Sequence, residues 1–168
     1  MTNDLSAEDV RALLKLEPHS TCGFVRSTFV SNQRIPRGGL PAPFPDGRPT
    51  ALYFMGRGMR PCDSIAFATI SFITVTWAIR LKVPMLHENG TSERVVIGPE
   101  LQAGQCVQLL IPGNTFHTAR VVGQRRWFLG ASTEWPGVEK VDVEIGSVEA
   151  LAAKYPDVAD DVRSFQQG

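Results

Sequence analysis

The stretch SIAFATISFITVTWAIRLKV, from Ser64 to Val83, decides which fold class the chain adopts. It is rich in β-branched and aromatic residues, which favour strands, and it contains no His, Asp, Glu or Cys. Its uncharged part, Ser64 to Ile79, has 16 residues and includes several Ser and Thr, whereas a membrane-spanning helix needs about 20 mainly apolar residues. The stretch therefore predicts strands in the wall of a β-barrel, not a membrane helix.

Similar short β-rich runs lie on both sides of this stretch and are separated by turn sequences. They read TALYFM, VPMLHE, ERVVIG, QCVQLLIP, TFHTARVV, RWFLGAST and VEKVDVEIG. Between the second and third runs, Asn89 and Gly90 form a pair that is typical of a type I′ hairpin turn. Many short strands at a spacing of about 8–12 residues predict an all-β sandwich or barrel.

Short helices are expected only at the two ends of the chain. Ser6 and Asp9 form a variant of the capping box, with Asp in place of Glu, before the helical pattern AEDVRALLKL. Near the other end, Ser147 is expected to cap SVEALAAKY, and Pro156 to start a second helical piece, PDVADDVRSF. No internal repeat or linker is evident, so we expect one domain over residues 1–168, with its core at about residues 13–156.

The charge balance gives no reason to expect a polyanionic partner. Lys and Arg together number 17, as do Asp and Glu, so we expect neither nucleic-acid nor membrane binding. Cys22, Cys62 and Cys106 are too few and too scattered for a disulfide framework or a zinc knuckle. The first residues do not follow the pattern of a signal peptide, and we expect a cytoplasmic protein.

Several segments resemble the cupin 5 family, a group of cupin-like barrels. The N-terminal segment LKLEPHSTCGFVRSTFVS is similar to the family's first signature, and RPTALYFM is similar to its next strand. IGPELQAGQCVQLLIPGNTFHTA and STEWPGVEKVDVEIGSVEALAAKYP resemble two later segments. The resemblance runs from about Leu13 to Pro156. It implies an all-β fold, a cupin-like double-stranded β-helix or jelly-roll barrel with short N- and C-terminal helices, and a homodimer.

The chain departs from this family where metal ligands are expected. The family commonly has a His, an Asp-Glu pair and a Trp-His pair on the strands that correspond to Ile65–Thr76. Laid on this chain, those positions are occupied by Ala66, Ser71, Phe72, Thr74 and Val75. Because a cupin metal site normally needs three or four His and Glu donors, we predict no metal and no other cofactor.

His117 and Arg26 are the candidate catalytic residues. His117 lies where many cupins have a metal-binding histidine, and its imidazole suits general acid/base chemistry at neutral pH; a hydrogen-bonded core histidine is the alternative. Arg26 is either solvated or turned inward, where a substrate carboxylate, phosphate or enolate would pair with it.

The predicted substrate-binding residues share the barrel interior. By the period of two in a strand, Ala66, Phe72, Thr74 and Thr76 lie on one face, which forms either packed core or an apolar pocket. The complete predicted set is Gln108, Thr28, Tyr53, Ala66, Phe72, Thr74, Thr76 and Trp135.

These features favour a metal-independent enzyme that acts on a small, partly apolar organic molecule. Isomerisation, epimerisation or cyclisation, in natural-product or sugar metabolism, needs a positioned acid/base in a dry cavity. The alternative is a cupin module that binds a small molecule without turnover. A metal enzyme whose ligands lie at other positions is a third possibility, for which His19 and His117 would need an added carboxylate.

Overall fold

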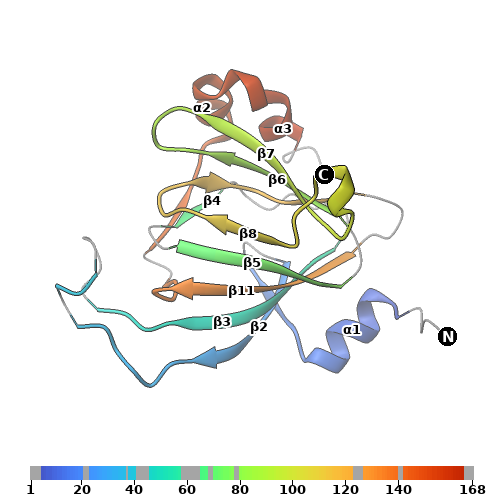
Figure 1. Cartoon of the computed structure of the whole chain (residues 1–168), viewed down its shortest axis with the longest axis vertical. Helices are drawn as coiled ribbons and strands as arrows, with labels where there is room; N and C mark the ends of the chain where they lie inside the picture. Colours follow the sequence, from blue (N-terminus) through green and yellow to red (C-terminus); the bar gives the residue numbers. More distant parts are fainter. Residues whose placement is uncertain are drawn as a thin grey trace.

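The computed structural model describes residues 5–20, 23–36, 38–40, 46–57, 65–67, 70–77, 80–122, 127–139 and 142–164. Its strands form two antiparallel sheets that pack face to face, with short helices at both ends of the chain (Figure 1). Cys22 and Cys62 lie outside these residues, and Cys106 is a free thiol. None of the described helices is long and apolar enough to cross a membrane.

The first sheet has six strands, and a strand from late in the chain lies near its centre. Its order is β1 (Glu17–His19), β2 (Gly23–Val30), β3 (Thr50–Arg57), β11 (Trp127–Trp135), β5 (Ile70–Trp77) and β8 (Gln108–Ile111). All neighbouring pairs are antiparallel.

The second sheet is built around one apolar strand. Its order is β10 (Arg120–Val122), β6 (Arg80–Leu86), β9 (Phe116–His117), β4 (Ile65–Phe67) and β12 (Val143–Ile145), and β7 (Ser92–Ile97) also pairs with β6. A short 3₁₀ helix, η1 (Leu101–Ala103), lies between β7 and β8.

The main core lies between the two sheets and draws residues from both. Ile73, Leu109, Ile111 and Phe128 come from the first sheet, and Leu81, Val83, Met85 and Ile97 come from the second. Side chains therefore fill much of the space between the described strands. The prediction of an all-β, cupin-like fold is confirmed in its main features, although these strands form two separate sheets and not one closed barrel.

The first helix packs on the outer side of the first sheet. α1 (Ala7–Leu14) begins with the predicted capping box, in which Ser6 and Asp9 bond reciprocally. Its buried side, with Ala7 and Val10, packs in one cluster with Met55, Trp127 and Leu129. Figure 1 shows α1 beside the end of β2, β3 and β11. α1 thus covers part of this face.

The C-terminal helices cover the second sheet. α2 (Val148–Lys154), the 3₁₀ turn η3 (Pro156–Val158) and α3 (Ala159–Ser164) bury an apolar cluster that includes Leu86 of β6. Ser147 is the N-cap of α2, as predicted, but its hydroxyl makes no capping hydrogen bond. Pro156 begins the second helical piece, which confirms that prediction.

The β6–β7 hairpin is confirmed, but its turn type differs from the prediction. Gly90 has φ +87°, whereas Asn89 is not among the described residues with positive φ. The backbone N–H of His87 donates to the carbonyl of Thr91 at 2.9 Å, and that of Gly90 donates to the carbonyl of His87 at 3.0 Å. A type I′ turn needs positive φ at both central residues, so this turn is longer and uses only glycine in the left-handed region.

Candidate functional site

The face of β5 that points into the core is not the face that the sequence predicted, but the opposite one. Ile73 lies in the core between the sheets, and its partner across the strands, Leu109, lies there too. Because successive side chains point to opposite faces, Phe72 and Thr74 lie on the outer face of the first sheet. The expectation that they line the interior is thereby corrected; a shift of one residue in register moves a whole set to the other face.

The polar residues expected beside them also lie on the outer face. Gln108 pairs with Thr74, Ala131 pairs with both Thr74 and Tyr53, and Tyr53 pairs with Arg26, which makes one row across five strands. Gln108 reaches Thr74 Oγ1 only at 3.4 Å. The fold brings these predicted residues together, but outside the core.

The Arg26 side chain contacts the end of the N-terminal helix and does not line an interior site. Its side chain is exposed, and Nη1 donates to the carbonyl oxygen of Leu14 at 3.1 Å. Leu14 is the last residue of α1, where carbonyl groups lack helical partners and a cation is favourable. This contact gives Arg26 a structural reason for its position and separates it from His117.

The other predicted binding residues are dispersed. Thr28 is exposed and lies where the β2–β3 register shifts. Trp135 is 53 % exposed. Ala66 and Thr76 belong to β4 and β5, but their side chains lie outside the described ones. The predicted substrate-binding set therefore does not form one interior pocket among the described residues.

His117 does lie on the inner face, as its register requires. It pairs with Met85 on the neighbouring strand, and Met85 belongs to the core between the sheets. Paired residues in adjacent strands point to the same side. His117 is only 8 % exposed, so its imidazole is in contact with protein and not with bulk water.

Burial determines the protonation state of this imidazole. Loss of solvation, partly offset by the contact between Nδ1 and the carbonyl of Thr115 at 3.2 Å, lowers the pKa of His117 to about 4. The ring is therefore neutral at neutral pH. A carbonyl can only accept a hydrogen bond, so Nδ1 carries the ring hydrogen, and Nε2 is the basic nitrogen.

Glu134 is a second buried titratable group, and it is not among the site residues predicted from the sequence. It is 8 % exposed and lies on the inner face of β11, directly across from Ser71 of β5. Burial raises the pKa of Glu134. The hydrogen bonds that its carboxylate accepts from Thr50 Oγ1, at 3.1 Å, and from the backbone N–H of Val138 lower the pKa but do not outweigh burial. A carboxyl group with a raised pKa can supply a proton closer to neutral pH.

Ser71 adds a buried hydroxyl that has no hydrogen-bond partner among the described atoms. Ser71 is 3 % exposed, and its Oγ is buried without a hydrogen-bond partner in the part of the chain that the structure describes. Such a group costs free energy unless a water or a ligand satisfies it. Ser71 pairs with Ile111 on one side and Glu134 on the other, so its hydroxyl points to the same inner space as the Glu134 carboxyl.

The chain connections bring His117 to the same end of the molecule. Ile111, next to Ser71, ends β8, and only residues 112–115 separate it from β9, which contains His117. β4, which pairs with His117, is separated from β5 by only two residues. In Figure 1 the arrow of β11, which carries Glu134, ends at the left of the view. Because the β8–β9 and β4–β5 connections are this short, we expect Ser71, Glu134 and His117 to share one end of the space between the sheets.

A surface hollow lies next to this end. It has a volume of about 660 Å³ and is formed by the β6–β7 turn and the β8–β9 turn; its lining residues are His87, Glu88, Asn89, Thr91, Pro112, Gly113 and Thr115. Thr115 is also the residue whose carbonyl contacts the His117 ring. Thr115 therefore both lines the hollow and contacts the buried imidazole.

Comparison with known proteins agrees with this architecture. The family model described as Cupin superfamily (DUF985) matches residues 8–146. The chain belongs to this cupin family. No curated protein matches the chain.

Solved structures show the same fold over nearly the whole cupin domain. A hypothetical protein from Leishmania major has 19 % identity and a TM-score of 0.81, and the match covers 95 % of this chain and 97 % of that one. A protein from Shewanella oneidensis has 25 % identity, the same TM-score, and coverage of 96 % and 97 %. Oxalate decarboxylase from Bacillus subtilis is more distant, with 10 % identity, a TM-score of 0.52, and coverage of 85 % and 35 %.

The described residues of this cupin do not fit a cupin metal centre. No group of three or more His, Cys, Asp or Glu side chains that could hold a metal ion occurs among them. The inner position on β5 that corresponds to the family's Asp holds Ser71, whose hydroxyl is a poor substitute for a carboxylate ligand. Among the buried residues that the structure describes, His117 and Glu134 carry the His and carboxylate donors that cupin centres use, and these two donors are fewer than the usual three or four.

Proposed function

We propose that this cupin is a metal-independent enzyme that moves protons on a small, partly apolar organic molecule, as an isomerase, epimerase or cyclase does. The observation that carries the proposal is the burial of two titratable side chains, Glu134 and His117, that face the same inner space from opposite sheets. Their environments shift the two pKa values in opposite directions, and such pairs are typical of acid/base sites.

In the proposed reaction, each buried group has one role. Nε2 of neutral His117 takes a proton from a carbon next to a carbonyl group, and the electron pair of that C–H bond moves to the carbonyl oxygen. The Ser71 hydroxyl donates a hydrogen bond to the resulting enolate. Glu134 returns a proton to carbon, on the opposite face or at another position. One proton leaves and one returns, so the reaction needs no oxidant or reductant.

The surroundings of the site fit a partly apolar substrate. Ile73, Leu109 and Ile111 lie on the same inner face as Ser71, and ligand sites usually combine apolar walls with a few placed polar groups. The hollow that Thr115 helps to line lies on the surface beside the β8–β9 turn, and in this proposal the substrate enters from that side. We propose the cytoplasm as the compartment, and natural-product or sugar metabolism as the pathway class.

A binding module without turnover is the second candidate. The observation in its favour is the dense apolar packing between the sheets, where Phe128 and Met85 are nearly inaccessible to solvent. In that case, Ser71 and Glu134 would hold a ligand by hydrogen bonds, and the low basicity of His117 would have no catalytic use. The two candidates differ in whether the bound molecule exchanges protons.

The first experiment identifies the ligand and then tests for proton transfer. Native mass spectrometry of the purified protein detects an organic molecule that stays bound, and extraction identifies it. Incubation of that molecule with the protein in D₂O then shows whether deuterium enters a C–H position. The enzyme predicts deuterium incorporation or a rearranged product, whereas the binding module predicts an unchanged ligand.

Variants then assign the site. Glu134→Gln and His117→Gln should each lower deuterium incorporation at least about a hundredfold, because each removes an acid/base group. Ser71→Ala should weaken the reaction while leaving the fold equally stable or more stable, because it removes an unpaired buried hydroxyl. Thr74→Ala, on the outer face of the same strand, is the matched control. Full activity of Glu134→Gln and His117→Gln would refute the site.

A further inference from the structure

The carboxyl group of Glu134 is held by two hydrogen-bond donors that the proposed reaction does not use. Glu134 lies near the end of β11 and is paired with Thr50, the first residue of β3. Paired residues of neighbouring strands point to the same side, so both side chains face the inner space. The Thr50 hydroxyl donates a hydrogen bond to Glu134 Oε2 at 3.1 Å, and the backbone N–H of Val138 is the second donor. The carboxyl group is therefore fixed from the sheet and from the segment after β11.

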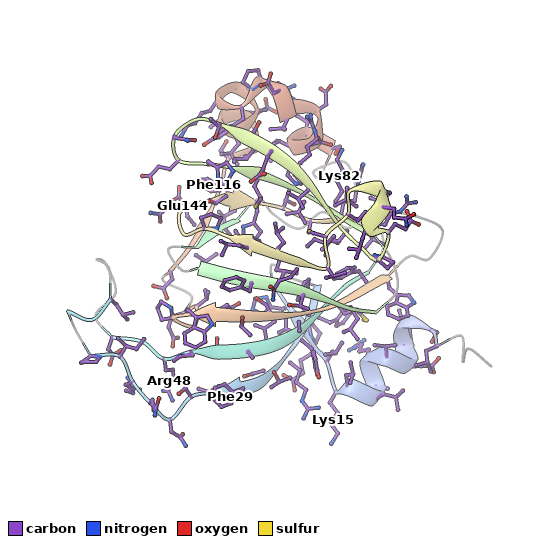
Figure 2. All side chains as sticks on the ribbon, in the orientation of Figure 1. Lys15, Phe29, Arg48, Lys82, Phe116 and Glu144 are labelled. Carbon is purple, nitrogen blue, oxygen red and sulfur yellow. The ribbon has the colours of Figure 1, made fainter. Side chains whose placement is uncertain are left out.

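The segment that follows β11 turns back toward Thr50, and Gly137 allows it to come close. The N–H of Gly137 donates to the carbonyl oxygen of Arg48 at 2.8 Å, and Arg48, labelled in Figure 2, lies two residues before β3. A Cβ on Gly137 would lie 2.4 Å from Thr50 Cγ2 and 2.8 Å from Thr50 Oγ1. Cβ atoms do not approach other atoms this closely, so any other residue at position 137 would displace the Thr50 side chain. Gly137 thus keeps the Thr50 hydroxyl within reach of Glu134.

The hydrogen bond from Thr50 makes the two oxygens of the Glu134 carboxyl group unequal. A protonated carboxyl group has one oxygen that carries the hydrogen and one that can only accept. Because Oε2 accepts the hydrogen of the Thr50 hydroxyl, the proton of the neutral acid is placed on Oε1. A general acid must lie within hydrogen-bond reach of the atom that it protonates. Holding one oxygen therefore determines which oxygen can serve as the acid and where it lies.

We propose that Thr50 is a positioning residue of the acid/base site: its hydroxyl holds Oε2 of Glu134, so that Oε1 gives its proton to the substrate. Thr50 acts through Glu134 and not on the reacting atoms, and the inference rests on the function proposed above. In the transfer, the Oε1–H bond breaks, its electron pair stays on the carboxylate, and the enolate's electron pair forms the new C–H bond. Without the Thr50 hydroxyl, the terminal torsion of the Glu134 side chain, whose preference is broad, would let either oxygen face the substrate.

Carbon-13 NMR of protein labelled at the side-chain carboxyl carbon of glutamate tests this contact without any substrate. The signal of Glu134 is the one that Glu134→Gln removes, and its change with pH follows the ionisation of this group. The hydrogen bond from Thr50 lowers the pKa of Glu134, so Thr50→Val, which replaces the hydroxyl with a methyl group, should move the titration midpoint to higher pH. Thr50→Ser keeps the hydroxyl and should leave the midpoint close to that of the wild type.

Two further variants separate the position of the hydroxyl from its presence. Gly137→Ala keeps the hydroxyl but displaces it, so its titration midpoint should also move to higher pH. Thr133→Val is the matched control, because Thr133 precedes Glu134 on β11 and points to the opposite face, and it should leave the midpoint unchanged. Circular dichroism verifies that all variants are folded. An unchanged midpoint in Thr50→Val overturns the proposal, as does an equal change in Thr133→Val.

Deuterium incorporation into the ligand identified by native mass spectrometry then tests the catalytic effect. Thr50→Val should lower kcat at least about tenfold with little change in KM, because a misplaced acid affects the transfer step and not binding, and Thr50→Ser should restore kcat. Because Glu134 acts as an acid, its higher pKa also moves the loss of rate at alkaline pH to higher pH. A changed NMR midpoint with an unchanged rate and pH profile would refute the positioning role alone. No incorporation by the wild type would instead refute the proposed function, and the positioning role with it.

Discussion

Replacing Asp161 should loosen the C-terminal helices from the second sheet. The carboxylate of Asp161, on α3, accepts hydrogen bonds from Lys82 Nζ of β6 at 2.6 Å and from Arg94 Nε of β7 at 2.5 Å. Arg94 also donates to the carbonyl oxygen of Asp157. In Figure 2, Lys82 lies beside the C-terminal helices. One carboxylate therefore connects two strands of the sheet to the end of the chain.

The size of the effect follows from the burial of these groups. The Asp161 side chain is 12 % exposed, Lys82 is 26 % exposed and Arg94 is 46 % exposed. A hydrogen bond to a charged group contributes about 1.5–3 kcal/mol to stability. Because the Arg94 side chain is nearly half exposed, solvent screening reduces the contribution of its ion pair with Asp161. We expect Asp161→Asn to lower the free energy of unfolding by about 2 kcal/mol, which corresponds to roughly 4–8 °C in Tm.

The dependence on pH has a definite sign. Burial of Asp161 opposes its ionisation, but the hydrogen bonds and charges of Lys82 and Arg94 outweigh burial and lower the pKa below 3.8. The stabilisation is therefore complete above pH 3.8 and is lost as the pH falls through the pKa of the folded state. The wild type and Asp161→Asn should approach each other in stability at acidic pH.

Urea unfolding followed by circular dichroism measures this difference. Asp160→Asn is the control, because Asp160 is the neighbouring carboxylate on the same helix, and its side chain is fully exposed, with Arg163 at 3.9 Å. Both variants lose one negative charge in the first turn of α3, so any general effect of helix charge cancels. If Asp161→Asn were no less stable than Asp160→Asn, the contacts with Lys82 and Arg94 would not stabilise the fold.

Three further predictions concern β11 and α1. Burial raises the pKa of Glu134, so the stability that this carboxyl group contributes is present below pH 4.5 and is lost as the pH rises through its folded-state pKa. Urea unfolding across this range should show that the free energy of unfolding of the wild type falls with rising pH, whereas that of Glu134→Gln does not. Parallel pH profiles of the two proteins would refute this prediction. Gly130→Ala should lower the free energy of unfolding by about 1–3 kcal/mol in the same assay, because the added Cβ would lie 2.7 Å from ring atoms of both Phe54 and Phe128. An unchanged urea midpoint would show that the two rings move aside. Ser6→Ala should lower the unfolding free energy by about 1 kcal/mol through loss of the capping box, and no change would mean that α1 is held by its packed side alone.

The sequence predicted those parts of the fold that local chemistry determines. The capping box of Ser6 and Asp9, the hairpin at Gly90 and the break at Pro156 each depend on residues a few positions apart, and each is confirmed. The cupin family was also recognisable from spaced motifs. Local signals of this kind do not depend on which face of a strand is covered.

The direction of the β5 side chains could not be read from its sequence. Both faces of ISFITVTW mix apolar and hydroxyl residues, with Ser71 and Ile73 on one face and Phe72 and Thr74 on the other. Alternation is informative only when one face is clearly polar. The inner face becomes evident only from pairing with Leu109 and Ile111 on a distant strand.

Glu134 was missed because the last strand of the first sheet was expected to end at Thr133. β11 in fact runs to Trp135. Continuing the period of two from Phe128 would have placed Ser132 and Glu134 on one face, since Phe128 is a large apolar residue and an obvious core candidate. The raised pKa of Glu134 depends on burial by other strands, which no local pattern reveals.

The position of β11 has a consequence for how the chain matures. β11 lies between β3 and β5 and pairs with both along most of its length. Until residues 127–135 have left the ribosome, the inner edges of β3 and β5 have no partner, and unpaired strand edges bind other unpaired strands. Because the pairing joins positions more than fifty residues apart in sequence, closure of this sheet is a late and slow step of folding. A nascent or truncated chain that stops short of Trp127 is thus exposed to misassembly that the complete chain avoids.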